Sequence, residues 1–160
     1  MQRLFEVKGR DPSAAIPLIA GDEATAGEAG AFGDDERRLA RALWPGPLTI
    51  VVPPSPALSP LVTGGAGTVG VRVPAHPVAR GLAAAFGWCI TATSANPSGQ
   101  PAAVTADAVA AALGDRIDLL LDAGPAPGGP PSTIVRVEHG RATLLRPGAL
   151  PWERVLESLE

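Results

Sequence analysis

Cysteine is almost absent from this sequence of 160 residues, which contains only Cys89. A single thiol can build neither an internal disulfide framework nor a zinc site based on cysteines. Its neighbours Trp88 and Ile90 are apolar, so Cys89 is expected in an apolar segment. These features predict a protein of a reducing, cytoplasmic environment.

Long apolar segments are also missing. No run reaches the roughly 18 consecutive apolar residues that a membrane-spanning helix needs. The first residues hold one basic side chain, Arg3, with no apolar stretch behind it. The sequence therefore predicts neither a membrane span nor a signal peptide.

An excess of positive charge is the third absence. Thirteen basic side chains against 16 acidic ones give a net charge of −3, which offers no general attraction to a nucleic-acid backbone. Any contact with nucleic acid is therefore expected to be local. Lys8 is the one lysine among these basic residues.

Glycine and proline are abundant, with 19 and 18 residues, yet 46% of the chain is hydrophobic. That apolar content favours a loop-rich globular domain over a disordered chain. A chain of this length can bury a true core within one domain. The periodicity of apolar residues then predicts the elements. Helices are expected at 1–7, 34–43, 76–86, 105–113 and 151–159, and strands at 16–20, 48–52, 69–73, 88–93, 117–121, 133–137 and 142–145.

The order of these elements indicates the fold class. Helices and strands alternate through much of the chain, which is typical of parallel strands joined by helices. Residues 133–145 instead predict an antiparallel hairpin that turns at 138–140. We therefore expect an α/β fold with a twisted, mixed parallel and antiparallel sheet flanked by helices. Two long connections, 53–67 and 124–131, are interrupted by Pro and Gly and are expected to be irregular.

Two local patterns assign faces to these elements. In the segment 69–73 the valines alternate with Arg72, which places Arg72 on the opposite face of the strand. In the helix 76–86 the apolar residues Val78, Leu82 and Phe86 recur every four positions.

Lys8 and Arg10 flank Gly9 at the expected end of the first helix. A bend at Gly9 would let both side chains point at one anion, with lysine as a point charge and arginine as a two-pronged donor. A solvated helix terminus would carry the same residues, because positive charge is favoured at that end of a helix. Both interpretations stay open on these three residues.

Small polar residues follow the expected strand 88–93, in the segment 94–99. Hydroxyl, amide and free backbone N–H groups after a strand are typical of a nucleotide site. The same residue types are the commonest in ordinary turns. No Walker or dinucleotide-binding glycine motif is present, and no acid–base pair stands out. No catalytic residue or metal ligand is therefore expected, and bound ATP would need an unusual site.

Six motifs, in this order and spacing, resemble the YrdC-like (Sua/YciO/YrdC) threonylcarbamoyl-AMP synthase family. The match runs from Lys8 to about Leu150, and six dispersed motifs are harder to meet by chance than one. The motifs are Lys8-Gly9-Arg10, Trp44-Pro45-Gly46-Pro47-Leu48-Thr49, Val69-Gly70-Val71-Arg72-Val73-Pro74, Thr93-Ser94-Ala95-Asn96, Ser132-Thr133-Ile134 and Leu145-Arg146-Pro147-Gly148.

The resemblance implies a YrdC-like fold and a defined reaction. L-threonine and bicarbonate would give a carbamate that attacks the α-phosphate of ATP, supplied with Mg²⁺, and pyrophosphate would leave. A partner transferase would then move the threonylcarbamoyl group to an adenosine in tRNA. By the resemblance, the ATP-binding residues are Lys8, Arg10, Thr68, Ser94, Asn96 and Arg146, and the threonine-binding residues are Arg72, Ala92 and Ser132.

The resemblance also implies a single YrdC-like domain, residues 1–160, that lacks the family's N-terminal strand and turn. The expected helix at 1–7 has no N-cap before it, and helices of two turns are not stable alone. Two other interpretations stay open: an RNA-binding module, since relatives imply weak contact with tRNA or double-stranded RNA, and a non-catalytic scaffold that keeps the fold.

An extended form that includes the family's first segment should release pyrophosphate faster in the presence of threonine and bicarbonate. The expected gain is at least about a hundredfold, equivalent to about 2.7 kcal/mol of transition-state stabilisation. Both forms are compared in a coupled pyrophosphate assay. Equal rates for the 160-residue form and the extended one would contradict the expectation.

Overall fold

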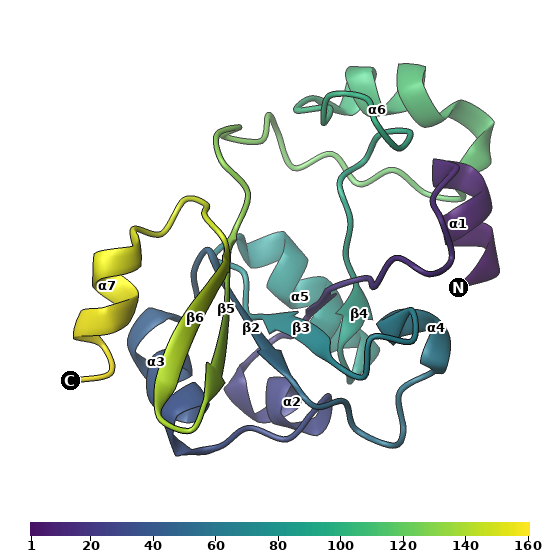
Figure 1. Cartoon of the computed structure of the whole chain (residues 1–160). Helices are drawn as coiled ribbons and strands as arrows, with labels where there is room; N and C mark the ends of the chain where they lie inside the picture. The colour runs from purple at the N-terminus through teal and green to yellow at the C-terminus, as the bar shows by residue number, and fades with distance from the viewer.

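The computed structural model describes residues 1–160 and has a six-stranded sheet at its centre (Figure 1). Across the sheet the strand order is β4-β1-β3-β2-β5-β6. The strands are β1 (Leu18–Ile19), β2 (Leu48–Val52), β3 (Val69–Arg72), β4 (Ile90–Thr91), β5 (Thr133–Glu138) and β6 (Arg141–Arg146). The helices are α1 (Gln2–Lys8), α2 (Glu23–Glu28), α3 (Asp34–Leu43), α4 (Pro60–Thr63), α5 (Pro77–Phe86), α6 (Ala106–Leu113), the 3-10 helix η1 (Gly114–Arg116) and α7 (Trp152–Glu157).

The strand directions confirm the expected mixed sheet. β1 runs parallel to β3, and β2 runs parallel to β5, while the other three pairs are antiparallel. The hairpin of β5 and β6 turns through His139 and Gly140, at φ 52° and 76°. Two consecutive residues with positive φ characterise the turn that best matches strand twist, so the hairpin prediction is confirmed.

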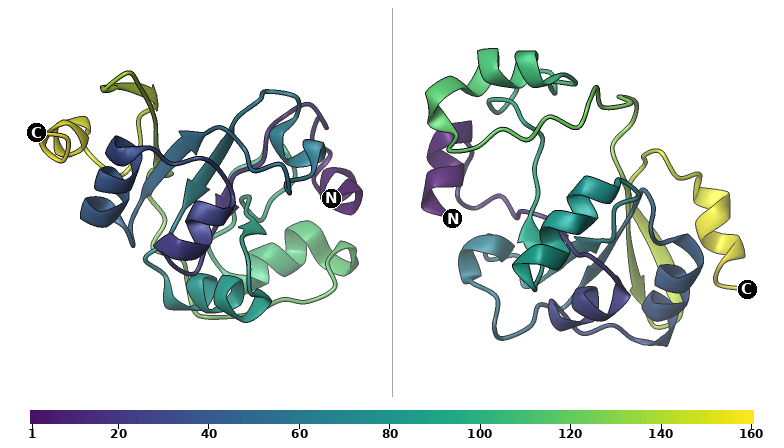
Figure 2. Two further views of the ribbon diagram at one scale, coloured as in Figure 1. Left: turned by 90° about the horizontal axis from the view of Figure 1, so that it is seen from below. Right: turned by 180° about the vertical axis from the view of Figure 1, so that it is seen from behind.

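One face of the sheet is buried against helices. Seen from behind, α2, α3 and α5 lie across it (Figure 2). Alternating strand residues such as Leu48, Ile50, Val69, Val71 and Val135 point to this side and are at most 1% exposed. With α-helical residues they form one apolar core of 17 buried side chains, which is the main stabilising feature of the domain.

The opposite face of the sheet is open and polar. Thr49, Gly70 and Arg72 share it, because β2 and β3 pair antiparallel with Ile50 opposite Val71. The valines of β3 are buried and Arg72 is half-buried, as the alternation predicts. A methyl group on Gly70 would come within 2.9 Å of the Thr49 methyl. Glycine on β3 therefore leaves room for the Thr49 side chain of β2.

A small group of elements stands apart from the sheet. α1, α6 and η1 lie together above the open face (Figure 1). Arg116 donates hydrogen bonds to the carbonyls of Val7 and Leu113, and an exposed ion pair joins Arg3 to Asp118 at 3.1 Å. The connections from this group back to the sheet pass close to the open face.

The prediction of a strand at 117–121 is wrong. These residues form no strand, and Leu119 is 74% exposed. The segment has strand-like composition, but such composition stabilises a strand only where a neighbour pairs with it. The connection 53–67, which was expected to be irregular, contains the short helix α4, capped by Ser59.

The apolar repeat on α5 does not face the core. Leu82 is 43% exposed and Phe86 is 68% exposed, whereas Ala83 is fully buried. The helix lies so close to the sheet that a methyl group on Gly21 would approach the side chain of Ala84 to 3.1 Å. Small residues allow that approach, so Ala83 packs inward and the larger side chains Leu82 and Phe86 face solvent.

The starts of two helices agree with the predictions from the sequence. The Thr105 side chain accepts from the Ala108 amide at the start of α6, and acidic residues occupy the first turn of α3, where the helix dipole favours them. The longest helices, α3 and α5, have 10 residues each, and no helix combines the length and apolar character needed to cross a membrane.

The two leucines Leu39 and Leu82 provide a matched test of this packing. Leu39→Ala should destabilise the domain by about 2–5 kcal/mol, because Leu39 is fully buried. Leu82→Ala removes the same atoms from a helix surface and should cost less than about 1 kcal/mol. Chemical denaturation of both variants measures the difference. Equal losses would mean that α5 packs through its large apolar residues after all.

Candidate anion-binding site

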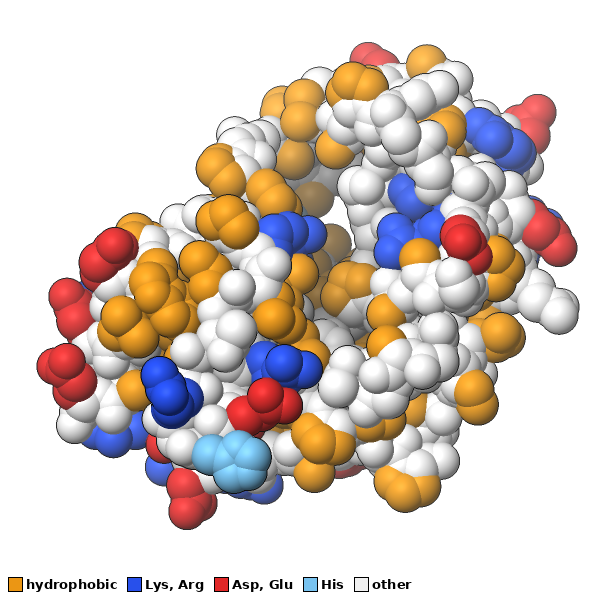
Figure 3. All heavy atoms as spheres, viewed as in Figure 1, with side chains coloured by type: hydrophobic (Ala, Val, Ile, Leu, Met, Phe, Trp, Pro, Cys, Tyr) orange, Lys and Arg blue, Asp and Glu red, His pale blue; other side chains and the backbone are white.

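A cavity of about 470 Å³ opens on the polar face of the sheet. Three arginines line it, Arg10, Arg72 and Arg146, and its lining contains no aspartate or glutamate. Figure 3 shows the hollow with basic side chains on either side of it. An environment with three cations and no counter-charge favours an anionic ligand. The hydroxyl side chains in the lining are Thr49, Thr93, Ser94 and Ser132.

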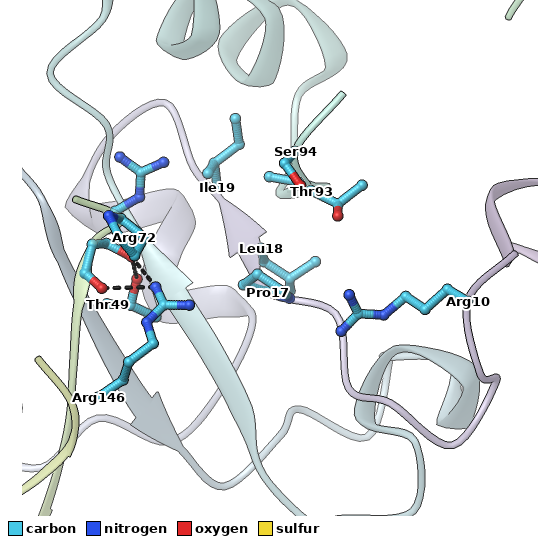
Figure 4. Close-up of a pocket in the computed structure, with 12 residues that line it drawn as sticks. Arg10, Pro17, Leu18, Ile19, Thr49, Arg72, Thr93, Ser94 and Arg146 are labelled. Carbon is cyan, nitrogen blue, oxygen red and sulfur yellow. Dashed lines mark hydrogen bonds between the residues drawn. The ribbon is translucent and has the colours of Figure 1, made fainter. Parts of the chain in front are cut away.

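Arg72 projects from the last residue of β3 into this cavity (Figure 4). Burial and the positive charge of Arg146 lower the pKa of Arg72. Arg72 makes no ion pair with a protein carboxylate. Its guanidinium is therefore partly desolvated and available to a carboxylate or phosphate, which it can bind with two parallel hydrogen bonds.

Arg146 enters from the end of β6 and is held by the segment before β5. Its Nη2 donates to the carbonyl oxygen of Ser132 at 2.7 Å and to the Ser132 hydroxyl at 3.2 Å (Figure 4). The Ser132 hydroxyl lies 2.8 Å from the hydroxyl of Thr49. A methyl group on Gly148 would clash with the Pro131 carbonyl at 2.3 Å, so glycine allows the two segments this close approach.

Arg10 reaches the cavity from the other side. Gly9 ends α1 in the left-handed conformation at φ 57° and turns the chain toward the sheet. The Arg10 Nη2 donates to the Ala15 carbonyl at 2.9 Å, while its Nε is buried without a partner. The Nε therefore has an unmet hydrogen bond in this conformation.

Lys8 does not line the same cavity as Arg10. Its side chain is 6% exposed, and its ammonium donates to the carbonyl oxygens of Ser94 and Asn96. In return, the Ser98 amide donates to the Lys8 carbonyl at 2.8 Å. Burial, and then the charge of Arg10, lower the pKa of Lys8. In this conformation Lys8 fixes the shape of the loop after β4, and the two cations of the Lys8-Gly9-Arg10 motif point in different directions.

Asn96 also serves this loop. It is 6% exposed, and its side-chain amide donates to the carbonyls of Pro97 and Gln100 at 3.0 and 2.6 Å. Ser94, two residues earlier, lines the cavity. The polar segment 94–99 is thus a hydrogen-bonded turn that contributes Ser94 to the cavity lining.

The structure brings six of the nine expected site residues to the cavity: Arg10, Arg72, Ala92, Ser94, Ser132 and Arg146. The Ala92 amide donates a hydrogen bond to the Pro17 carbonyl at 2.9 Å, which extends the β1–β4 pairing. Thr68 lies just before β3 and does not line the cavity. Lys8 and Asn96 do not line the cavity, and their hydrogen bonds hold the loop after β4.

Thr49 and Thr93 were not expected at the site, although both line it. Thr49 was detectable in principle, because it alternates with the apolar residues of β2 that face the core. A second cavity, of about 690 Å³, adjoins the first and shares Ala92, Thr93 and Ser94 with it. Its wall includes Lys8 and the exposed segment after η1.

The mixed sheet and its arginine-lined open face define an α/β domain with a cavity whose charge suits an anionic ligand. Residues 1–148 match the family model Sua5_yciO_yrdC, described as telomere recombination. The chain belongs to this Sua5/YciO/YrdC family, and the expected fold is confirmed.

Curated relatives share that family. The chain is 37% identical over 156 residues to the threonylcarbamoyl-AMP synthase of Pyrococcus abyssi, covering 97% of this chain and 46% of that protein. It is 37% identical over 157 residues to the Bacillus subtilis enzyme of the same name, covering 97% of this chain and 45% of that protein. The putative enzyme of Mycobacterium tuberculosis is 38% identical and is covered to 72%, with 98% of this chain aligned. The chain spans about half the length of the first two relatives.

Solved structures agree with the sequence comparison. Pyrococcus abyssi Sua5 complexed with L-threonine superimposes with a TM-score of 0.92 at 34% identity, covering 98% of this chain and 46% of that one. Escherichia coli YciO has a TM-score of 0.84 at 18% identity, with 97% of this chain and 76% of that one covered. The second likeness concerns the fold alone.

Lys8 and Arg10 are two residues apart but should respond differently to substitution. Lys8→Met leaves the Ser94 and Asn96 carbonyls without their donor and should destabilise the domain by about 1–3 kcal/mol. Arg10→Gln should change stability by less than about 0.5 kcal/mol, since Arg10 binds one exposed carbonyl. Thermal and denaturant unfolding distinguish the two. If Lys8→Met is as stable as the parent, Lys8 does not fix the loop.

Proposed function

We propose that this domain makes threonylcarbamoyl-AMP from L-threonine, bicarbonate and ATP. The single observation that carries the proposal is the cavity with three arginines and no carboxylate on the open face of the sheet. The substrates and intermediates of this reaction carry carboxylate, carbamate and phosphate groups, which match that charge. The names of the curated relatives agree with it.

The proposed chemistry needs no nucleophilic side chain. The threonine amine and bicarbonate form a carbamate with loss of water. A carbamate oxygen then attacks the α-phosphorus of ATP, the bond to the β-phosphate oxygen breaks, and pyrophosphate leaves. Positioning of the two substrates and stabilisation of the charge on the phosphorus can supply the rate enhancement. The lack of an acid–base pair at the site is consistent with such a mechanism.

The proposed roles divide the cavity between the substrates. Arg72 and Ser132 would hold the threonine carboxylate and hydroxyl beside the Ala92 backbone. Arg10, Ser94 and Arg146 would bind the nucleotide, together with Thr68, the residue before β3. Lys8 and Asn96 would act on ATP through the loop that they hold in this conformation.

Magnesium would enter with ATP as part of the substrate. No cluster of three His, Cys, Asp or Glu side chains suitable for a metal occurs in the chain, so the phosphates themselves would supply ligands. The product would pass to a transferase that modifies tRNA. A reducing, cytoplasmic setting belongs to the proposal and rests on the single buried cysteine, Cys89.

The proposal is tested by comparing arginines inside and outside the cavity. Arg72→Gln should lower pyrophosphate release in the presence of threonine and bicarbonate by about ten- to a hundredfold, the loss of one charge-assisted contact. Arg136→Gln on β5 is the matched control, because Arg136 lies outside the cavity lining and pairs with Glu138 at 3.4 Å. Its rate should stay within about twofold of the parent, as for surface substitutions.

Three outcomes would contradict the proposal. Equal rates for Arg72→Gln and the parent would remove Arg72 from the site. ATP binding without threonine-dependent pyrophosphate release, in the parent and in an N-terminally extended form, would indicate a non-catalytic scaffold. A salt-sensitive shift of tRNA in gels, without ATP turnover, would indicate an RNA-binding module.

A further inference from the structure

The hydroxyl groups of Thr49 and Ser132 form a pair beneath Arg146. Their oxygens are 2.8 Å apart, and Arg146 Nη2 donates to the Ser132 oxygen at 3.2 Å. Thr49 comes from β2 and Ser132 from the residue before β5, so the pair joins segments 83 residues apart in sequence. The pair lies at the wall of the arginine-lined cavity (Figure 4).

The number of hydroxyl protons in this pair determines how many hydrogen bonds it can donate to a ligand. Each hydroxyl has one O–H donor, and one of the two protons occupies the bond between the oxygens. Neither hydroxyl has another protein acceptor: Ser132 Oγ contacts only Thr49 and Arg146, and Thr49 Oγ1 contacts only Ser132. One O–H is therefore left over for an acceptor in the cavity.

Burial decides which hydroxyl presents that proton. Thr49 is 3% exposed, whereas Ser132 is half-buried at the cavity wall. If Thr49 donates to Ser132, the Ser132 O–H is free to point outward beside the Arg146 guanidinium. The reverse direction would leave the remaining proton on the buried threonine, where an unmet donor is costly.

The backbone holds both residues firmly. β2 and β5 pair in parallel with Thr49 opposite Ile134, and the Thr133 amide donates to the Pro47 carbonyl at 2.9 Å. The Thr49 methyl packs on Gly70, where a methyl group would approach it to 2.9 Å. The orientation of the Thr49 hydroxyl is thus set by the sheet.

We propose that Thr49 is a positioning residue: it directs the Ser132 hydroxyl, and with it Arg146, toward a bound carboxylate or phosphate oxygen. The identity of that ligand as L-threonine rests on the proposed function, but the arrangement of donors does not. Thr49 acts through Ser132 and touches no ligand itself.

The test measures binding of L-threonine and of pyrophosphate by calorimetry to five forms of the chain: the parent, Thr49→Val, Thr49→Ala, Thr49→Ser and Ser132→Ala. Thr49→Val and Thr49→Ala should weaken binding by about three- to tenfold, the range for one neutral hydrogen bond. Thr49→Ser keeps the hydroxyl and should stay within about twofold of the parent. Melting temperatures are recorded for every form, so that a loss of folding is separated from a loss of binding.

A double-mutant cycle identifies the route of the effect. Because Thr49 acts through Ser132, Thr49→Ala should cause no further loss when it is added to Ser132→Ala. A further loss equal to that in the parent background would mean that Thr49 binds the ligand directly and would overturn the inference. Unchanged binding in both Thr49→Val and Thr49→Ala would overturn it as well, as would failure of Thr49→Ser to restore binding.

The two proposals fail in different ways. If the parent binds pyrophosphate but not L-threonine, the proposed substrate is wrong. The affinities of the Thr49 variants for pyrophosphate then test the positioning role. If the parent binds neither ligand, the cavity is not an anion site, and both proposals fall together. If the parent binds both and the Thr49 variants match it, only the positioning role is lost.

Discussion

The parallel pairing of β2 with β5 is the contact on which the rest of the molecule depends. It joins the first third of the chain to the last, with Leu48 opposite Thr133 and Ile50 opposite Val135. On the helical side, this register places Ile50 and Val135 in the core. On the open side, it brings the Thr49 hydroxyl to Ser132 and supports Arg146. One register therefore determines both stability and the shape of the site.

The site itself is held in an electrostatically unfavourable state. Arg72 and Arg146 lie near enough that the charge of one lowers the pKa of the other, and no carboxylate in the cavity lining offsets them. The apolar core must tolerate this repulsion, which an arriving anion relieves. Ligand binding and folding are consequently linked, since an anion that binds only the folded chain stabilises it. A lining with acidic residues would be more stable when empty and a poorer binder.

Patterns within one element were predictable from the sequence, and contacts between distant elements were not. The alternation of β3 placed Arg72 correctly, and the hairpin turn followed from its own residues. The burial of Lys8 depends on carbonyls 86 and 88 positions away in the sequence. The residues around Lys8 therefore contain no pattern that predicts it. The inward side of α5 depends on how closely the helix approaches Gly21, which favours alanine over the larger apolar residues.

The segment after η1 has a consequence for the behaviour of the protein in concentrated solution. Leu119, Leu120 and Leu121 lie exposed in a stretch without strand partners, and such stretches can seed sheets between molecules. Asp118 and Asp122 flank the three leucines. Charged residues beside an aggregation-prone segment oppose such association, and Asp118 is also held by its ion pair with Arg3. The leucines and the two aspartates that flank them all lie outside the core, so this segment bears on self-association rather than on folding.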